Sequence, residues 1–145
     1  MQDKAIALSA ASLPIRLAVM VYELLLVAAV LMISALPFVL LARDAQTGWL
    51  HTLFQVYLLA MLFLYFSAFW LRSGQTLAMK TWRVRLVSLS GDRLSLKQAA
   101  LRFAFAWLGL LAAGLGFVWA LFDRDRQFLH DRLAGTRLIR VARPA

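Results

Sequence analysis

The stretch LAVMVYELLLVAAVLMISALPFVLLA, residues 17–42, is apolar along almost its whole length and contains one charged residue, Glu23. About 20 apolar residues are enough for an α-helix to cross the hydrocarbon core of a bilayer, so this stretch predicts a membrane-spanning helix. A carboxylate near the bilayer centre costs about 2.5–3.5 kcal/mol or more. We therefore expect Glu23 to face protein rather than lipid.

Arg16 precedes this stretch and lies seven residues before Glu23. The two side chains share roughly one helix face but are about 10 Å apart along the axis, which is too far for a direct ion pair. We expect Arg16 either to extend toward the lipid headgroups or to pair with an acid from elsewhere in the chain.

The composition indicates an integral membrane protein. Hydrophobic residues make up 63% of the 145 residues and charged residues 16%, against about 45–50% apolar residues in soluble proteins. The net charge of +9 would suggest nucleic acid in a soluble protein. Here the basic residues flank apolar runs, so the bilayer and its anionic headgroups are the expected partners and nucleic acid is not. With no cysteine, thiolate chemistry is absent, and we expect no cofactor.

We interpret residues 1–145 as one domain with three apolar segments, a basic connector and a polar tail. The segments cover about residues 15–41, 49–71 and 103–122, the connector 72–102, and the tail 123–145. This predicts an all-α membrane protein whose first segment is a retained anchor rather than a signal peptide. Because the connector carries seven basic residues and one acidic residue, the positive-inside rule places it and the N-terminus in the cytoplasm.

The path of the third segment stays open between two alternatives. Its length favours a full crossing, so we expect three crossings. The alternative is a re-entrant segment that returns near Gly114–Gly116, which would keep the basic tail inside. In that case the alternating strand pattern of Trp82–Val87 can pair with Arg137–Val141 in a small hairpin-like element. A capping box from Ser95 to Gln98 predicts that a helix begins near Leu96.

Three motifs carry more specific information: RLA at residues 16–18 with the acid Glu23 after it, GQTLAMK at 74–80, and HDRLAGT at 130–136. Together they resemble the RDD family of small integral membrane proteins, which is named for one arginine and two aspartates. The resemblance covers nearly the whole chain.

In this resemblance Arg16 matches the arginine and Asp131 the second aspartate, while Glu23 stands where the family has its first aspartate. The resemblance implies a membrane protein for which transport of unidentified ligands has been proposed, with cation/proton antiport attributed to some members.

Glu23 is the main candidate for a functional site. A carboxyl group in a low dielectric can exchange a proton for a cation, with Arg16 and Asp131 as coupled charges. The alternative is a buried ion pair that fixes helix packing. Supporting candidates are His130, Arg132, Gln75, Thr76 and Lys80. No spacing of histidines and acids fits a structural metal site.

These residues lead to two hypotheses for the function. The first is a subunit of an oligomeric, cation/proton-coupled transporter in the bacterial inner membrane, because one small protomer can hardly enclose a pathway. The second is a non-transporting scaffold or accessory protein, alone or with a partner membrane protein. No nucleophile motif supports an enzyme.

Overall fold

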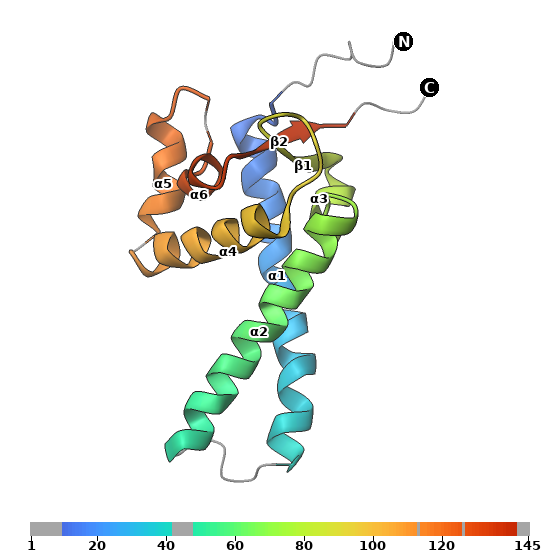
Figure 1. Ribbon diagram of the computed structural model, residues 1–145, viewed down its shortest axis with the longest axis vertical. Helices are drawn as coiled ribbons and strands as arrows, with labels where there is room; N and C mark the ends of the chain where they lie inside the picture. The colour runs from blue at the N-terminus through green and yellow to red at the C-terminus, as the bar shows by residue number, and fades with distance from the viewer. Residues whose placement is uncertain (1–9, 42–47, 113, 126, 142–145) are drawn as a thin grey trace.

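The computed structural model describes residues 10–41, 48–112, 114–125 and 127–141. Two long helices form a pair, and the shorter elements gather around one end of it (Figure 1). In chain order the elements are α1 (Leu13–Leu41), α2 (Gly48–Arg72), α3 (Leu77–Thr81), β1 (Val84–Ser88), α4 (Leu96–Leu111), α5 (Leu115–Phe122), α6 (Leu129–Leu133) and β2 (Thr136–Arg140).

Helices α1 and α2 are long enough and apolar enough to cross a membrane. Pro37 lies inside α1, and the helix continues past it to Leu41. Near this end the ring of Phe38 packs 4.9 Å from the ring of Phe54 on α2, measured between centroids. Large apolar side chains such as Leu40 are exposed on this pair. A lipid environment accounts for such a surface, because water would penalise it.

The third apolar segment is not one continuous helix. α4 and α5 meet at an angle of 97° across a break that includes residue 113, which lies outside the described residues. Gly114 has a φ of +76° at the start of α5. A Cβ on Gly109 would lie 3.2 Å from the Cα of Gly116, so the two helices approach closely at these glycines. The break falls where the re-entrant alternative placed the return, and the number of crossings stays a prediction.

The connector and the tail join in a two-stranded antiparallel sheet. β1 pairs with β2 in a register that places Val84 opposite Arg140 and Ser88 opposite Thr136. The backbone N–H of Ala11 donates to the carbonyl of Leu138 at 3.1 Å, which ties the chain before α1 to the same sheet. The strand pairing that the re-entrant alternative allowed, on the basis of the alternating pattern, is thus confirmed.

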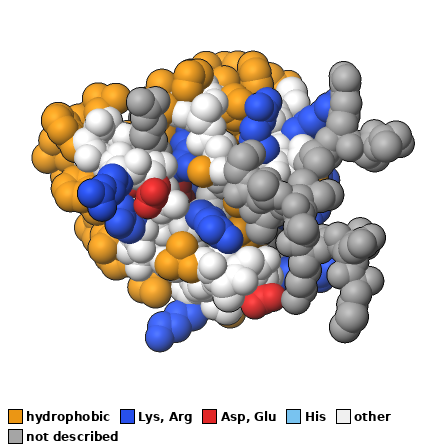
Figure 2. Space-filling model, turned by 90° about the horizontal axis from the view of Figure 1, so that it is seen from above, with side chains coloured by type: hydrophobic (Ala, Val, Ile, Leu, Met, Phe, Trp, Pro, Cys, Tyr) orange, Lys and Arg blue, Asp and Glu red, His pale blue; other side chains and the backbone are white. Residues whose placement is uncertain are grey.

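The buried core lies where α1, α2 and α4 meet the sheet. It includes Val19, Trp70, Leu86 and Phe103, one from each of these elements. Seen from the sheet end, Lys and Arg side chains are spread across the surface and apolar side chains lie around its edge (Figure 2). This distribution suits an end that lies at the headgroup level of a bilayer.

Helix α4 begins as its sequence predicts. The Ser95 hydroxyl accepts a hydrogen bond from the N–H of Gln98, and the Gln98 side chain accepts one from the N–H of Ser95. This capping box satisfies donors that would otherwise be unpaired at the helix start. It fixes the point from which α4 runs to one side, away from the pair of long helices (Figure 1).

Candidate functional site

Glu23 faces protein, as the cost of a lipid-facing carboxylate predicts. The Tyr65 hydroxyl donates to its Oε1 at 2.9 Å, and the Thr76 hydroxyl donates to its Oε2. The side chain is half-buried, and no Lys, Arg or His among the described residues lies within ion-pair distance of it. Glu23 therefore connects α1 to α2 and to the start of α3 through neutral donors.

The GQT motif places one of these donors. The carbonyl of Gly74 accepts from the N–H of Leu86 at 2.7 Å, and the Gln75 side chain donates to the carbonyl of Val84 at 2.7 Å. Both bonds hold the end of α2 against β1. Thr76, which is fully buried, is the N-cap of α3 and accepts from the N–H of Met79. The motif thus fixes the Thr76 hydroxyl against Glu23.

Asp131 forms an ion pair with Arg102, and both side chains are buried. The guanidinium of Arg102 also donates to the Thr136 hydroxyl at 3.4 Å and lies 5.0 Å from the ring of Trp70. Asp131 thus pairs with an arginine at the end of the basic connector and not with Arg16. Arg102 was not among the predicted site residues. The available signal was its position directly before the charge-free stretch 103–122.

His130 is buried between aromatic rings. It stacks on Phe128 with an interplanar angle of 23°, and its Nε2 lies 3.7 Å from Oδ1 of Asp131. Burial, together with the positive charge of Arg102, lowers the pKa of His130 well below its usual value. The neighbouring carboxylate does not reverse this because Arg102 already neutralises it. With this lowered pKa, the imidazole of His130 is neutral near pH 7.

Two predicted supporting residues lie apart from Glu23. Arg132 pairs with Asp123, which also accepts from the backbone N–H of Gln127 at 3.0 Å. Burial alone would raise the pKa of Asp123, but backbone hydrogen bonds to its carboxylate and the charge of Arg132 hold this pKa below its usual value. Lys80 is exposed, with its Nζ 5.9 Å from the ring centroid of Phe69.

Arg16 is 1% exposed and does not pair with Asp131. Its Nε donates to the carbonyl of Ala11 at 2.7 Å. Within the described part of the chain, its two terminal nitrogens have no hydrogen-bond partner. A buried guanidinium with two unpaired donors is energetically costly. Arg16 is therefore a second candidate site residue beside Glu23.

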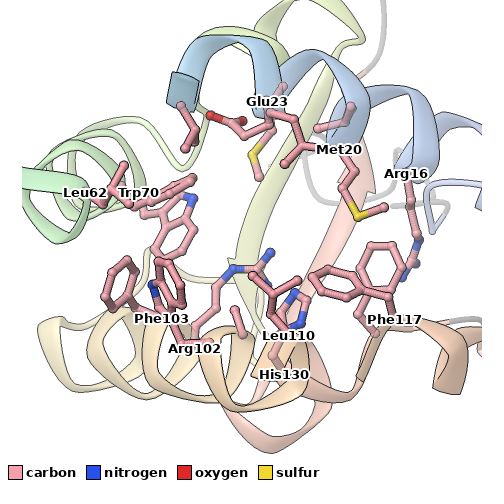
Figure 3. Close-up of a pocket in the computed structure, with 18 of the residues that line it drawn as sticks. Arg16, Met20, Glu23, Leu62, Trp70, Arg102, Phe103, Leu110, Phe117 and His130 are labelled. Atoms are coloured by element: carbon pink, nitrogen blue, oxygen red, sulfur yellow. The ribbon is translucent and has the colours of Figure 1, made fainter. Parts of the chain in front are cut away.

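A pocket of about 250 Å³ brings several of these residues together. It lies between α1 and α4, with α1 contributing Arg16 and Glu23 and α4 contributing Arg102 (Figure 3). His130 is the other polar residue on its wall, and the remaining lining residues are apolar or aromatic. Among the described residues, no three histidines or acids come close enough to hold a metal ion.

The fold and the site define a helical membrane protein whose buried charges gather at one end of two apolar helices. A profile of the RDD family matches residues 10–135, and the chain belongs to this family. It is 36% identical over 77 residues to an uncharacterised protein of Rickettsia prowazekii (strain Madrid E), a match covering 52% of this chain and 42% of that protein. The match thus spans less than half of that relative's length. No solved structure matches the chain significantly.

Proposed function

We propose that this RDD protein is a subunit of an oligomeric, cation/proton-coupled transporter in the bacterial inner membrane, and that Glu23 is the exchange site. The observation that carries the proposal is the environment of the Glu23 carboxylate, which receives two hydroxyl donors and lies on a pocket wall. A carboxylate held by neutral donors, without a fixed counter-ion, can release and regain a proton. Arg16 and the Arg102–Asp131 pair act as the neighbouring charges.

The proposed topology has two full crossings and one re-entrant pair. Paired strands must lie on the same side of a membrane, and β1 precedes the α4–α5 pair while β2 follows it. The 97° bend between α4 and α5 is compatible with entry and return. By the positive-inside rule, the basic sheet end and the N-terminus are cytoplasmic.

An oligomer, or a complex with a partner membrane protein, follows from the size of the protomer. Two long helices and a bent pair are too few to surround a polar path, and the exposed faces of α1 and α2 are apolar. The pathway would therefore form between protomers. The proposed role is not enzymatic.

The scaffold hypothesis is supported by a different observation. The hydroxyl bonds of Glu23 connect α1, α2 and the start of α3, and the Arg102–Asp131 pair connects α4 to α6. Polar links of this kind can specify how helices dock without moving any ion. Glu23 would then matter for folding alone.

Reconstitution in liposomes separates the two functions. We expect a cation gradient to drive proton movement in the wild type and Glu23→Gln to abolish it, because the amide cannot take up or release a proton. Tyr65→Phe is the matched control, since it removes one hydrogen bond to Glu23 and leaves the acid. Absence of flux in the wild type rejects the transport proposal. A wild type without flux, together with a Glu23→Gln protein that unfolds more easily, supports the scaffold. Normal flux in Glu23→Gln rejects Glu23 as the exchange site.

A further inference from the structure

Three of the described residues on the pocket wall have unpaired donors that cannot accept a hydrogen bond. Within the described residues, both terminal nitrogens of Arg16, the Nε of Arg102 and the indole Nε1 of Trp70 are buried and have no partner. All three residues line the pocket. Guanidinium and indole groups only donate. The chemistry that satisfies all of them is an anion with several oxygens.

The charges on the pocket wall also favour an anion as the ligand. Arg102 is neutralised by Asp131, whereas Arg16 has no ion-pair partner among the described residues. An arginine fork binds phosphate oxygens through paired, charge-assisted hydrogen bonds. One negative charge close to Arg16 would therefore compensate the buried cation.

The rest of the pocket is suited to a hydrocarbon chain. Along α1 the lining runs from Arg16 to Leu31, a distance of about 22 Å at the rise of an α-helix, which exceeds half of the hydrocarbon thickness. Leu24 and Leu110 line the pocket and are 62% and 53% exposed, so it opens between α1 and α4 onto the apolar surface. A ligand would enter from the lipid phase.

We propose that this pocket binds an anionic phospholipid of the bilayer, with the phosphate between Arg16 and Arg102 and one acyl chain along α1. In Figure 3 the two arginines approach the pocket from opposite walls, one from α1 and one from α4. Arg16 lies in the first turn of α1, at the depth where a phosphate headgroup meets the hydrocarbon. Glu23 lines the same pocket, and the lipid would bind whether or not Glu23 exchanges a proton.

Native mass spectrometry of the full chain in detergent tests the proposal with three probes. Phosphatidylglycerol carries phosphate and chains, diacylglycerol with the same chains lacks phosphate, and inorganic phosphate lacks chains. We expect phosphatidylglycerol to bind at least about tenfold more tightly than either of the others. Equal binding of diacylglycerol overturns the phosphate contact, and equal binding of inorganic phosphate overturns the lipid assignment.

Two variants and one control variant test whether the lipid binds in this pocket. Arg16→Gln should weaken phosphatidylglycerol binding about tenfold through loss of the charged donors. Ala106→Leu keeps every charge and narrows the path of the chain, while Ala104→Leu adds the same volume on the exposed face of α4, outside the pocket. We expect weaker binding for Ala106→Leu and unchanged binding for Ala104→Leu. If Arg16→Gln does not fold, the alanine pair decides, and equal binding by both overturns the proposal.

Discussion

At the scale of single residues, Gly74 shows how a short motif positions the candidate site. Its φ is +67°, and a Cβ there would lie 2.6 Å from the carbonyl oxygen of Leu86. Only glycine combines this backbone conformation with such a close approach to β1. The hydroxyl of Thr76 reaches Glu23 because the chain can turn at Gly74.

We expect Gly74→Ala to lower the free energy of unfolding by about 1–3 kcal/mol, since it adds both strain at positive φ and a contact with backbone. Gly91→Ala is the control, because Gly91 also has a positive φ but nothing lies within 4 Å of its Cβ position. Thermal unfolding in detergent measures the difference. Equal losses in the two variants would show that the close approach contributes nothing.

His130 predicts a pH dependence of stability. Its pKa is lowered in the folded protein, so the unfolded chain binds the proton more readily below the ordinary pKa of about 6.5. The contribution of the neutral imidazole to the free energy of unfolding is therefore complete above this ordinary pKa. It is lost as the pH falls below that pKa.

The measurement is the midpoint temperature of thermal unfolding, recorded at several pH values from about pH 7 to about pH 5. This range surrounds the ordinary histidine pKa. His130→Phe keeps an aromatic ring in the stack and removes the titration. We expect the midpoint to fall more steeply with acidification in the wild type than in this variant. Parallel pH profiles would refute a neutral buried His130.

Some of these residue roles could be read from the sequence and others could not. The inward orientation of Glu23 follows from the cost of a charge in lipid, which is a local property of one helix. The pairing of Asp131 with Arg102 depends on where α4 and α6 meet, and sequence spacing contains no such information. Tyr65 was one of several hydroxyl residues in the apolar segments, and only the packing of α2 on α1 selects it.

At the scale of elements, local signals predicted more than long-range ones. The capping box at Ser95 and the alternating residues of β1 each depend on neighbours within one turn or one strand. The break between α4 and α5 was harder to predict because stretch 103–122 is uniformly apolar. Gly114 was the available sequence signal for a re-entrant segment, whereas the length of the stretch favoured a full crossing.

The joint between α4 and α6 supports a prediction on the Arg102–Asp131 pair. Asp131→Asn leaves a buried guanidinium without its counter-ion, which typically costs about 3–5 kcal/mol. Replacing both residues with apolar side chains, as Arg102→Met with Asp131→Leu, removes both charges. We expect the double variant to be more stable than Asp131→Asn in denaturant unfolding. If the double variant is at least as unstable as Asp131→Asn, the ion pair does more than neutralise a buried charge. It then stabilises the contact between α4 and α6 itself.

At the scale of the whole molecule, the sheet decides how the chain can sit in a bilayer. β1 belongs to the basic connector and β2 to the tail, and their hydrogen bonds hold both at one end of the α1–α2 pair (Figure 1). A straight third crossing would separate the strands by the thickness of the membrane. In the proposed topology, the strand pairing therefore keeps the tail on the same side as the connector.

Single-cysteine labelling tests this requirement cleanly, because the chain contains no cysteine. Arg85 on β1 and Arg140 on β2 are both exposed, and Trp49 lies at the opposite end of α2. In right-side-out membrane vesicles we expect an impermeant maleimide to label Trp49→Cys and to leave Arg85→Cys and Arg140→Cys unlabelled until detergent is added. Labelling of Arg140→Cys but not Arg85→Cys would place the strands on opposite sides and exclude the sheet in the membrane-embedded protein.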